Sequence, residues 1–263
     1  MLLAGLYSDD CSPVLRWLKD AQPEVCAQCV LESGAAIADR ETLFRELHDA
    51  WLPRLTDVER EPRPEARAAI GRALGRLGLD DRKGVGLDAN GLPDIDWVTI
   101  PAGDFVYQDG ERRRLDGFRI ARYPVTNAQF RAFLDADDGY RDHRWWRGLT
   151  EPDRDPKQPS WDIANDPRET VSWFEAMAFC AWLSHRTGLA IRLPAELEWE
   201  RAAPTVGCIP GVASTSQAGP ISRKQGMISV NTRCSGPAPS ASIRRAPLRT
   251  VCWTSRAIFG NGV

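Results

Sequence analysis

Cysteine and histidine residues that could carry chemistry are few in this chain and lie far apart. Cys26 and Cys29 form a C-x-x-C pair within an expected helix. A zinc site of this type needs two further ligands at matching spacing, and neither a second pair nor a partner for His48 is present. We therefore interpret the pair as small residues near a packed helix face, without a catalytic or metal role.

A cluster of His143, Trp145 and Trp146 offers two interpretations. Aromatic rings beside a histidine suit the recognition of a sugar or a peptide, but such rings more often pack the core of a fold with little regular structure. We favour packing. His185 falls near the end of an expected helix, where a favourable contact with the helix dipole explains it most simply.

Glu196, Glu198 and Glu200 resemble a carboxylate cluster in the sequence. On a helix, however, residues two apart do not face each other, so we do not expect these carboxylates to act together. The sequence shows no nucleophile triad, phosphate-binding loop or Cys/His cluster. It therefore predicts no catalytic, cofactor-binding or metal-binding residue in this chain.

Residues 1–79 have the pattern of an all-helical segment. Pro23 and Pro64 each precede amphipathic stretches, as is typical of proline in the first turn of a helix. A further helix is expected from Arg40, and Gly78 is expected to end the helix that contains Ile70 and Leu74. The unit around residues 73–82 resembles a HEAT-type helical repeat. Residues 80–94, rich in Gly and Asp, predict a linker.

Residues 95–203 change to a mixture of strands and helices. Short extended stretches are expected at residues 97–106 and 117–125, followed by helices that begin after Thr126 and Ser172. In both helices the residue three positions later, Gln129 or Glu175, completes a capping box. Phe130, Phe133 and Phe179 are expected on the buried faces of these helices.

Four stretches, in order, resemble the formylglycine-generating enzyme family, also called the sulfatase-modifying factor domain. They read WVTIPAGDF at residues 97–105, YPVTNAQF at 123–130, VSWFEA at 171–176 and RLPAELEWERAA at 192–203. One departure is Ala195, where the family usually has Thr or Ser to cap the next helix, at a cost of about 1 kcal/mol. The resemblance covers the first half of such a domain.

This resemblance implies an α+β fold of the C-type-lectin-like kind, incomplete here, after the helical-repeat segment. Some members of the family use paired cysteines with copper and oxygen to convert a sulfatase cysteine into formylglycine. Others are iron-dependent sulfoxide synthases, and others are ligand-binding modules. The catalytic cysteines of the family lie near its C-terminal end, and Cys208, Cys234 and Cys252 of this chain match none of its motifs. We therefore expect no copper or iron in this chain.

Residues 204–263 differ from everything before them. They carry seven Lys or Arg and no Asp or Glu, and 21 of the 60 residues are Pro, Gly or Ser. Re-reading their codons from the third base permits Tyr-Pro-Trp-Gly and Gly-Asn-Ile-Trp-Glu-Trp, two blocks of the family, in the family's order. A shift of reading frame near Ala203 explains this detail, whereas a basic tail that binds nucleic acid or membrane explains only the charge. We expect the tail to be aberrant and disordered.

The chain is accordingly expected to be a family member that is catalytically inactive because its C-terminal half is lost. The alternative is a non-catalytic, lectin-like module with a protein or peptide ligand, at the end of a larger helical-repeat scaffold or sensor. Neither nucleic acid nor a membrane is an expected partner, and a cytoplasmic location is the default. The truncation also predicts that Phe130, Phe133, Trp173, Phe179 and Trp199 lack packing partners.

Overall fold

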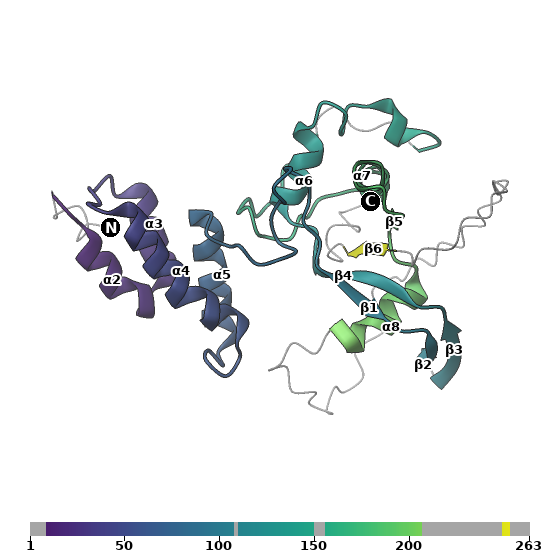
Figure 1. Ribbon diagram of the computed structural model, residues 1–263, viewed down its shortest axis with the longest axis horizontal. Coiled ribbons are helices and arrows are strands. Elements are labelled where there is room, and N and C mark those ends of the chain that lie inside the picture. Colours follow the sequence, from purple (N-terminus) through teal and green to yellow (C-terminus); the bar gives the residue numbers. More distant parts are fainter. Residues whose placement is uncertain (1–8, 108–109, 150–155, 207–248, 253–263) are drawn as a thin grey trace.

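A computed structural model describes residues 9–107, 110–149, 156–206 and 249–252, with the backbone alone for 204–206 and 249–252. An all-helical unit is followed by a mixed domain of helices and short strands, and α5 is the helix of the first unit that lies nearest to the domain (Figure 1). The mixed domain is consistent with the α+β class expected from the sequence.

The helical unit contains α2 (Ser12–Ala21), α3 (Pro23–Glu32), α4 (Arg40–Thr56) and α5 (Pro64–Leu77). Its helix ends follow from local sequence. Pro23 and Pro64 occupy the first turns of their helices, and Gly78 adopts a left-handed φ of 68° after α5, as expected. The fully buried side chains of the unit come from all four helices and include Leu15, Cys26, Leu43, Trp51, Ile70 and Leu74.

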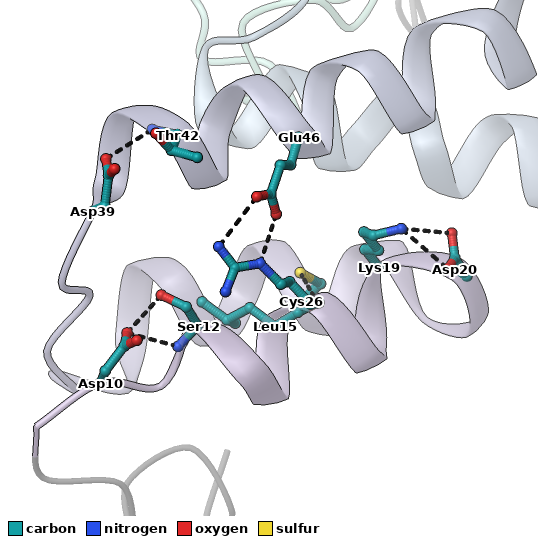
Figure 2. Close-up of polar contacts among 10 residues, drawn as sticks. Asp10, Ser12, Leu15, Lys19, Asp20, Cys26, Asp39, Thr42 and Glu46 are labelled. Atoms are coloured by element: carbon teal, nitrogen blue, oxygen red, sulfur yellow. Dashed lines mark hydrogen bonds and ion pairs between the residues drawn. The ribbon is translucent and has the colours of Figure 1, made fainter.

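Polar contacts join α2 to α4 and cap the start of α4 (Figure 2). Arg16 on α2 donates from Nε and Nη2 to the two carboxylate oxygens of Glu46 on α4, at 2.6 and 3.1 Å. Asp39 caps α4 by accepting a hydrogen bond from the amide of Thr42 at 2.9 Å. The indole of Trp51 donates to the carbonyl of Lys19 at 2.7 Å, so the buried ring has its polar atom satisfied.

The strands of the mixed domain form two sheets. A four-stranded sheet has the order β1-β4-β6-β5, with β1 and β4 antiparallel and β6 parallel to both of its neighbours; β2 and β3 form an antiparallel hairpin. The bounds are β1 (Trp97–Ile100), β2 (Gly103–Tyr107), β3 (Glu111–Leu115), β4 (Phe118–Pro124), β5 (Ile191–Arg192) and β6 (Arg249–Cys252).

Helices α6 (Asn127–Asp135) and α7 (Trp173–Thr187) enclose the aromatic core of the domain together with the 3-10 helix η2 (His143–Trp146). Both predicted capping boxes are confirmed. The expectation that the aromatic faces lack partners is wrong for Phe130, Phe133 and Phe179, which are fully buried and pack against one another with ring centroids 5.8–5.9 Å apart. Trp173 and Trp199 remain 46% and 49% exposed.

The segment expected as a linker packs closely on the start of α6. The side-chain amide of Gln129 donates to the carbonyls of Gly84, Gly86 and Asp94, and Thr126 donates to the carbonyl of Val85. Val85 itself is buried. Residues 84–94 are therefore held against the mixed domain by the same two residues that cap α6.

Helix α8 (Glu196–Val206) follows Ala195 and continues three residues past Ala203, where the segment resembling the family was expected to end. Strand β6 also lies within the segment for which we expected no regular structure, and its backbone pairs with β4 and β5. Residues 207–248 and 253–263, on which the expectation of a disordered tail mainly falls, lie outside the described residues.

Candidate functional site at the junction of the two units

The segment from residue 156 to Ser172 has neither helix nor strand, and the start of α6 positions it. The amides of Asn127 and Ala128 donate to the carbonyls of Asp166 and Ala164, each at 2.9 Å. The side-chain amide of Asn127 donates to the carbonyls of Trp161 and Ile163. Because the first amides of a helix have no partner within it, these bonds satisfy α6 and fix the segment, called the junction loop below.

On one side of the junction loop, two buried charged side chains, Arg168 and Glu169, lie beside the aromatic core. Arg168 is 6% exposed, its guanidinium lies 4.9 Å from the Phe130 ring centroid, and it donates to the carbonyl of Lys157. Burial lowers the pKa of Arg168. The carboxylate of Glu169 accepts hydrogen bonds from the amides of Ser160 and Trp161, at 2.6 and 3.2 Å.

Thr170 has a positive φ of 55°, and it is the one non-glycine residue among those described whose φ is positive. A non-glycine residue in this region costs about 1–3 kcal/mol and persists only where its surroundings fix it. The Thr170 hydroxyl donates to the carbonyl of Gln158 at 3.1 Å, and the neighbouring Glu169 is held by two amides. The junction loop is thus held in one strained conformation.

The other side of the junction loop contacts the helical unit. The side-chain amide of Asn165 donates to the carbonyl of Gly71 on α5 at 2.8 Å and to Asp80 Oδ2 at 2.6 Å. Asp80 also forms a two-point ion pair with Arg82, and that guanidinium lies 5.4 Å from the Tyr123 ring centroid on β4. Burial alone would raise the pKa of Asp80, but the bonds from Arg82 and Asn165 hold it below its usual range. This network joins α5, the junction loop and β4.

A cavity of about 290 Å³ opens beside this network, between α5 and the junction loop. Burial raises the pKa of Asp166 at its wall. The arrangement places several guanidinium donors and one carboxyl group around a small polar space. The side chains and backbone that define it include Arg67, Gly71, Arg72, Arg82, Asn165 and Asp166.

The residues weighed from the sequence lie elsewhere. Trp146 is buried and donates to the carbonyl of Tyr140 at 2.8 Å, and Trp145 donates to the carbonyl of Asp138 at 2.6 Å. His185 contacts Trp145 with the two rings tilted by 48° and their centroids 5.3 Å apart, whereas His143 is exposed. These indoles serve packing, and they line no described cavity.

Glu196 and Glu198 of α8 contact different partners. Glu198 is buried and pairs with Arg192 through both carboxylate oxygens, at 2.5 and 2.6 Å. Glu196 accepts a hydrogen bond from the hydroxyl of Tyr107 at 2.8 Å. The structure therefore separates Glu196 from Glu198, in line with the rule that residues two apart on a helix face apart.

The four described cysteines are buried free thiols. Figure 2 shows Cys26 on α3 facing α2, where its Sγ–H donates to the carbonyl of Leu15 at 3.4 Å. Burial raises the pKa of Cys26 to about 12 and also raises the pKa of Cys180. Such thiols are inert, because the thiolate is the reactive form. Cys208 and Cys234 lie outside the described residues, and of Cys252 only the backbone is described.

His48, which stands apart from other candidate ligands in the sequence, lies between two carboxylates in the structure. Its Nδ1 is 3.2 Å from Asp49 and its Nε2 is 3.1 Å from Asp81, which follows α5. The two carboxylates favour the protonated imidazole, as acceptors of its N–H groups, and so raise the pKa of His48. Among the described residues, no three His, Cys, Asp or Glu side chains are arranged to hold a metal ion.

The junction was not predicted from the sequence, although one signal for it exists. Gly71 and Gly75 lie four residues apart within α5, where glycine weakens a helix. A Cβ on Gly75 would lie 1.9 Å from Asn165 Oδ1, so the glycine is required by the close approach of the junction loop. A glycine on one face of a helix can thus indicate a closely packed neighbouring segment.

Comparisons with known proteins agree with the mixed domain. Residues 88–218 match the family of the sulfatase-modifying factor enzyme 1-like domain. Hercynine oxygenase of Mycolicibacterium thermoresistibile is 43% identical over 103 residues, which cover 32% of this chain and 22% of that protein. Hercynine oxygenase of Mycolicibacterium smegmatis is 35% identical over 137 residues, covering 40% and 30%. Formylglycine-generating enzyme of Mus musculus is 30% identical over 148 residues, covering 39% and 38%.

The chain therefore spans less than two fifths of the length of each of these three relatives. Among the described residues, no helix is both long and apolar enough to cross a membrane.

Proposed function

Residues 88–218 form a domain of the sulfatase-modifying factor enzyme family, and from this premise we propose that the parent protein is an oxygenase of the hercynine oxygenase kind. We further propose that the present chain does not catalyse by itself. The oxygenase proposal rests on sequence identity. The chain is 35–43% identical to the hercynine oxygenases and 30% identical to the mouse formylglycine-generating enzyme.

The cysteines of the domain bear on whether the present chain could carry out the formylglycine-generating reaction. A formylglycine-generating reaction would need paired, accessible cysteines. Between residues 97 and 203 the sequence has Cys180 alone. Cys180 is 2% exposed, and burial raises the pKa of its thiol, so it supplies no thiolate at the surface.

Iron is the metal implied by the oxygenase branch, and the described residues do not fit it. They offer no group of three His, Cys, Asp or Glu side chains arranged around one point, whereas a protein-held iron needs such ligands. We therefore assign no iron ligand and no catalytic step to this chain. The lack of iron ligands among the described residues is why we propose that the present chain is inactive by itself.

We also propose a shift of reading frame near Ala203, which would account for the missing half of the domain. After residue 203 the sequence loses all acidic residues, and its codons, read in another frame, permit two later blocks of the family. We propose that the missing catalytic groups belong to that other frame. The four described cysteines are free thiols, which suits a reducing compartment such as the cytoplasm.

Sequencing the source DNA across codons 195–263 and the next few hundred bases tests the frame. The present chain and the restored chain are then each incubated with iron(II), oxygen, hercynine and a thiol co-substrate such as cysteine, and in parallel with a cysteine-containing peptide, and the products are measured by mass spectrometry. We expect oxidation of hercynine by the restored chain alone. Turnover by the present chain would refute its inactivity, and oxidation of the peptide instead of hercynine would refute the oxygenase assignment.

An exposed aromatic pair favours one alternative. Trp173 and Phe174 at the start of α7 are 46% and 37% exposed, and their rings stack edge to face with centroids 5.3 Å apart. Exposed aromatic surface of this kind can mark a binding site. The alternative function is a non-catalytic, lectin-like module for a protein or peptide ligand at the end of a helical-repeat scaffold. A restored chain that oxidises neither substrate would support it.

A further inference from the structure

We propose that the cavity between α5 and the junction loop binds a small oxyanion, a carboxylate or a phosphate group, through the guanidinium groups of Arg67 and Arg72. This inference is independent of the proposed oxygenase function. The cavity measures about 290 Å³, close to the lower limit of roughly 300 Å³ for ligand pockets. It has room for a small ligand only.

Among the arginines at the cavity wall, Arg67 has the guanidinium with the fewest hydrogen bonds to other described residues. Its Nη1 donates to the carbonyl of Glu61 at 2.6 Å. Its Nε and Nη2 have no hydrogen-bond partner, and no carboxylate pairs with it, within the described part of the chain. A guanidinium held by one carbonyl keeps a pair of parallel N–H donors for an incoming oxyanion, the geometry that such groups recognise best.

Arg72 and Arg82 add charge from two other directions. Arg72 uses Nε and Nη2 for Glu24, at 2.6 and 3.0 Å, which leaves Nη1. Arg82 likewise uses Nε and Nη2 for Asp80. These ion pairs hold the two side chains in place at the cavity wall, so that an anion meets donors that are already positioned.

Asp166 sets the balance of charge. Burial raises the pKa of its carboxyl group, nearby Arg72 and Arg76 on α5 oppose that rise, and Asp162 on the same loop adds to it. When protonated, Asp166 can donate a hydrogen bond to an oxyanion; when ionised, it repels one. Anion binding should therefore weaken as the pH rises through the pKa of Asp166.

Isothermal titration of the full chain with inorganic phosphate, and separately with acetate, tests the site at an ionic strength fixed with potassium chloride. We expect saturable binding of at least one anion with one site per chain. Phosphate alone would identify the ligand class as phosphate, and binding of both would identify a general carboxylate or phosphate site. Arg67→Gln should weaken the binding about tenfold, because it removes charge-assisted hydrogen bonds.

Two further variants make the result decisive. Arg45→Gln removes the same charge from an exposed position on α4, where Arg45 pairs with Glu41, and should leave binding unchanged. Asp166→Asn should strengthen binding at neutral pH and remove the part of the pH dependence that comes from Asp166, leaving only the titration of the anion itself, which a folding defect would not do. The proposal is wrong if neither anion saturates the full chain, or if Arg67→Gln and Arg45→Gln have equal effects.

Discussion

Glu198 shows how one buried side chain can serve two purposes. Its carboxylate pairs with Arg192 at 2.5 and 2.6 Å and accepts a hydrogen bond from the amide of Ala195 at 2.8 Å. These bonds lower its pKa against the effect of burial, which would raise it. The ion pair joins β5 to α8, and removing one partner leaves the other charge buried and unpaired.

We expect Glu198→Gln to lower the free energy of unfolding by about 3 kcal/mol, because Arg192 would lose its counter-charge. Urea denaturation followed by tryptophan fluorescence measures the change. Glu111→Gln is the matched control, since Glu111 is exposed on β3 and pairs with nearby Arg113. That control should change the stability by less than about 0.5 kcal/mol, and equal losses in the two variants would contradict the argument.

Glu61 should make the stability of the helical unit depend on pH. Hydrogen bonds from Arg63 and Arg54, at 3.0 and 2.6 Å, lower the pKa of this buried carboxylate to about 2. In the unfolded chain the pKa is about 4.3. The stabilisation is therefore complete above the unfolded pKa and is lost as the pH falls toward the folded value.

Glu61→Gln should lower stability at pH 7 and flatten the fall in stability between about pH 4.5 and pH 2. Urea denaturation followed by circular dichroism across that range measures both effects. Glu59→Gln, at an exposed position two residues away, provides the control and should keep the slope of the original protein. A slope unchanged by Glu61→Gln would mean that other carboxylates govern acid unfolding.

Helix ends are the elements that local sequence describes best. The capping boxes of Thr126 with Gln129 and of Ser172 with Glu175 were predicted and are confirmed, because each depends on residues three apart. The second role of Gln129 was not predicted. Its amide reaches carbonyls at residues 84, 86 and 94, 35–45 residues away, and no local pattern contains that information.

Helix α8 has half of a capping box, which predicts a stabilising change. Glu198 already accepts a hydrogen bond from the amide of Ala195, but the alanine has no side-chain oxygen to accept one from the amide of Glu198 in return. Ala195→Thr should therefore stabilise the protein by about 1 kcal/mol. Valine has nearly the same shape as threonine but lacks the hydroxyl, so Ala195→Val should give no gain in stability. Thermal denaturation compares the two, and equal effects would show that size, not capping, is responsible.

At the scale of the whole molecule, the sequence indicated two units but not how they meet. The change from helical spacing to short strands near residue 95 is visible in the composition and pattern. The contact between Asn165 and Asp80 joins residues 85 positions apart, a separation that no local sequence pattern spans. The candidate site at the junction was missed for the same reason, since the guanidiniums of α5 appear in the sequence as an ordinary solvated helix face.

Two glycines of α5 test whether the junction couples the units. A Cβ on Gly75 would lie 1.9 Å from Asn165 Oδ1 and 2.7 Å from Ile163 Cγ2, whereas a Cβ on Gly71 would lie 3.6 Å from Leu55 Cδ1, an ordinary contact. Alanine favours an isolated helix over glycine by about 1 kcal/mol at either position. The two substitutions should therefore have opposite effects on the whole protein.

Gly75→Ala should displace the junction loop and lower stability by about 1–3 kcal/mol, the usual cost of overpacking, while Gly71→Ala should raise it. Limited proteolysis adds the structural readout, because separated units expose the junction loop to cleavage that Gly71→Ala would not cause. If both variants gain stability and resist cleavage equally, then the contact of Asn165 with α5 does not hold the helical unit against the domain.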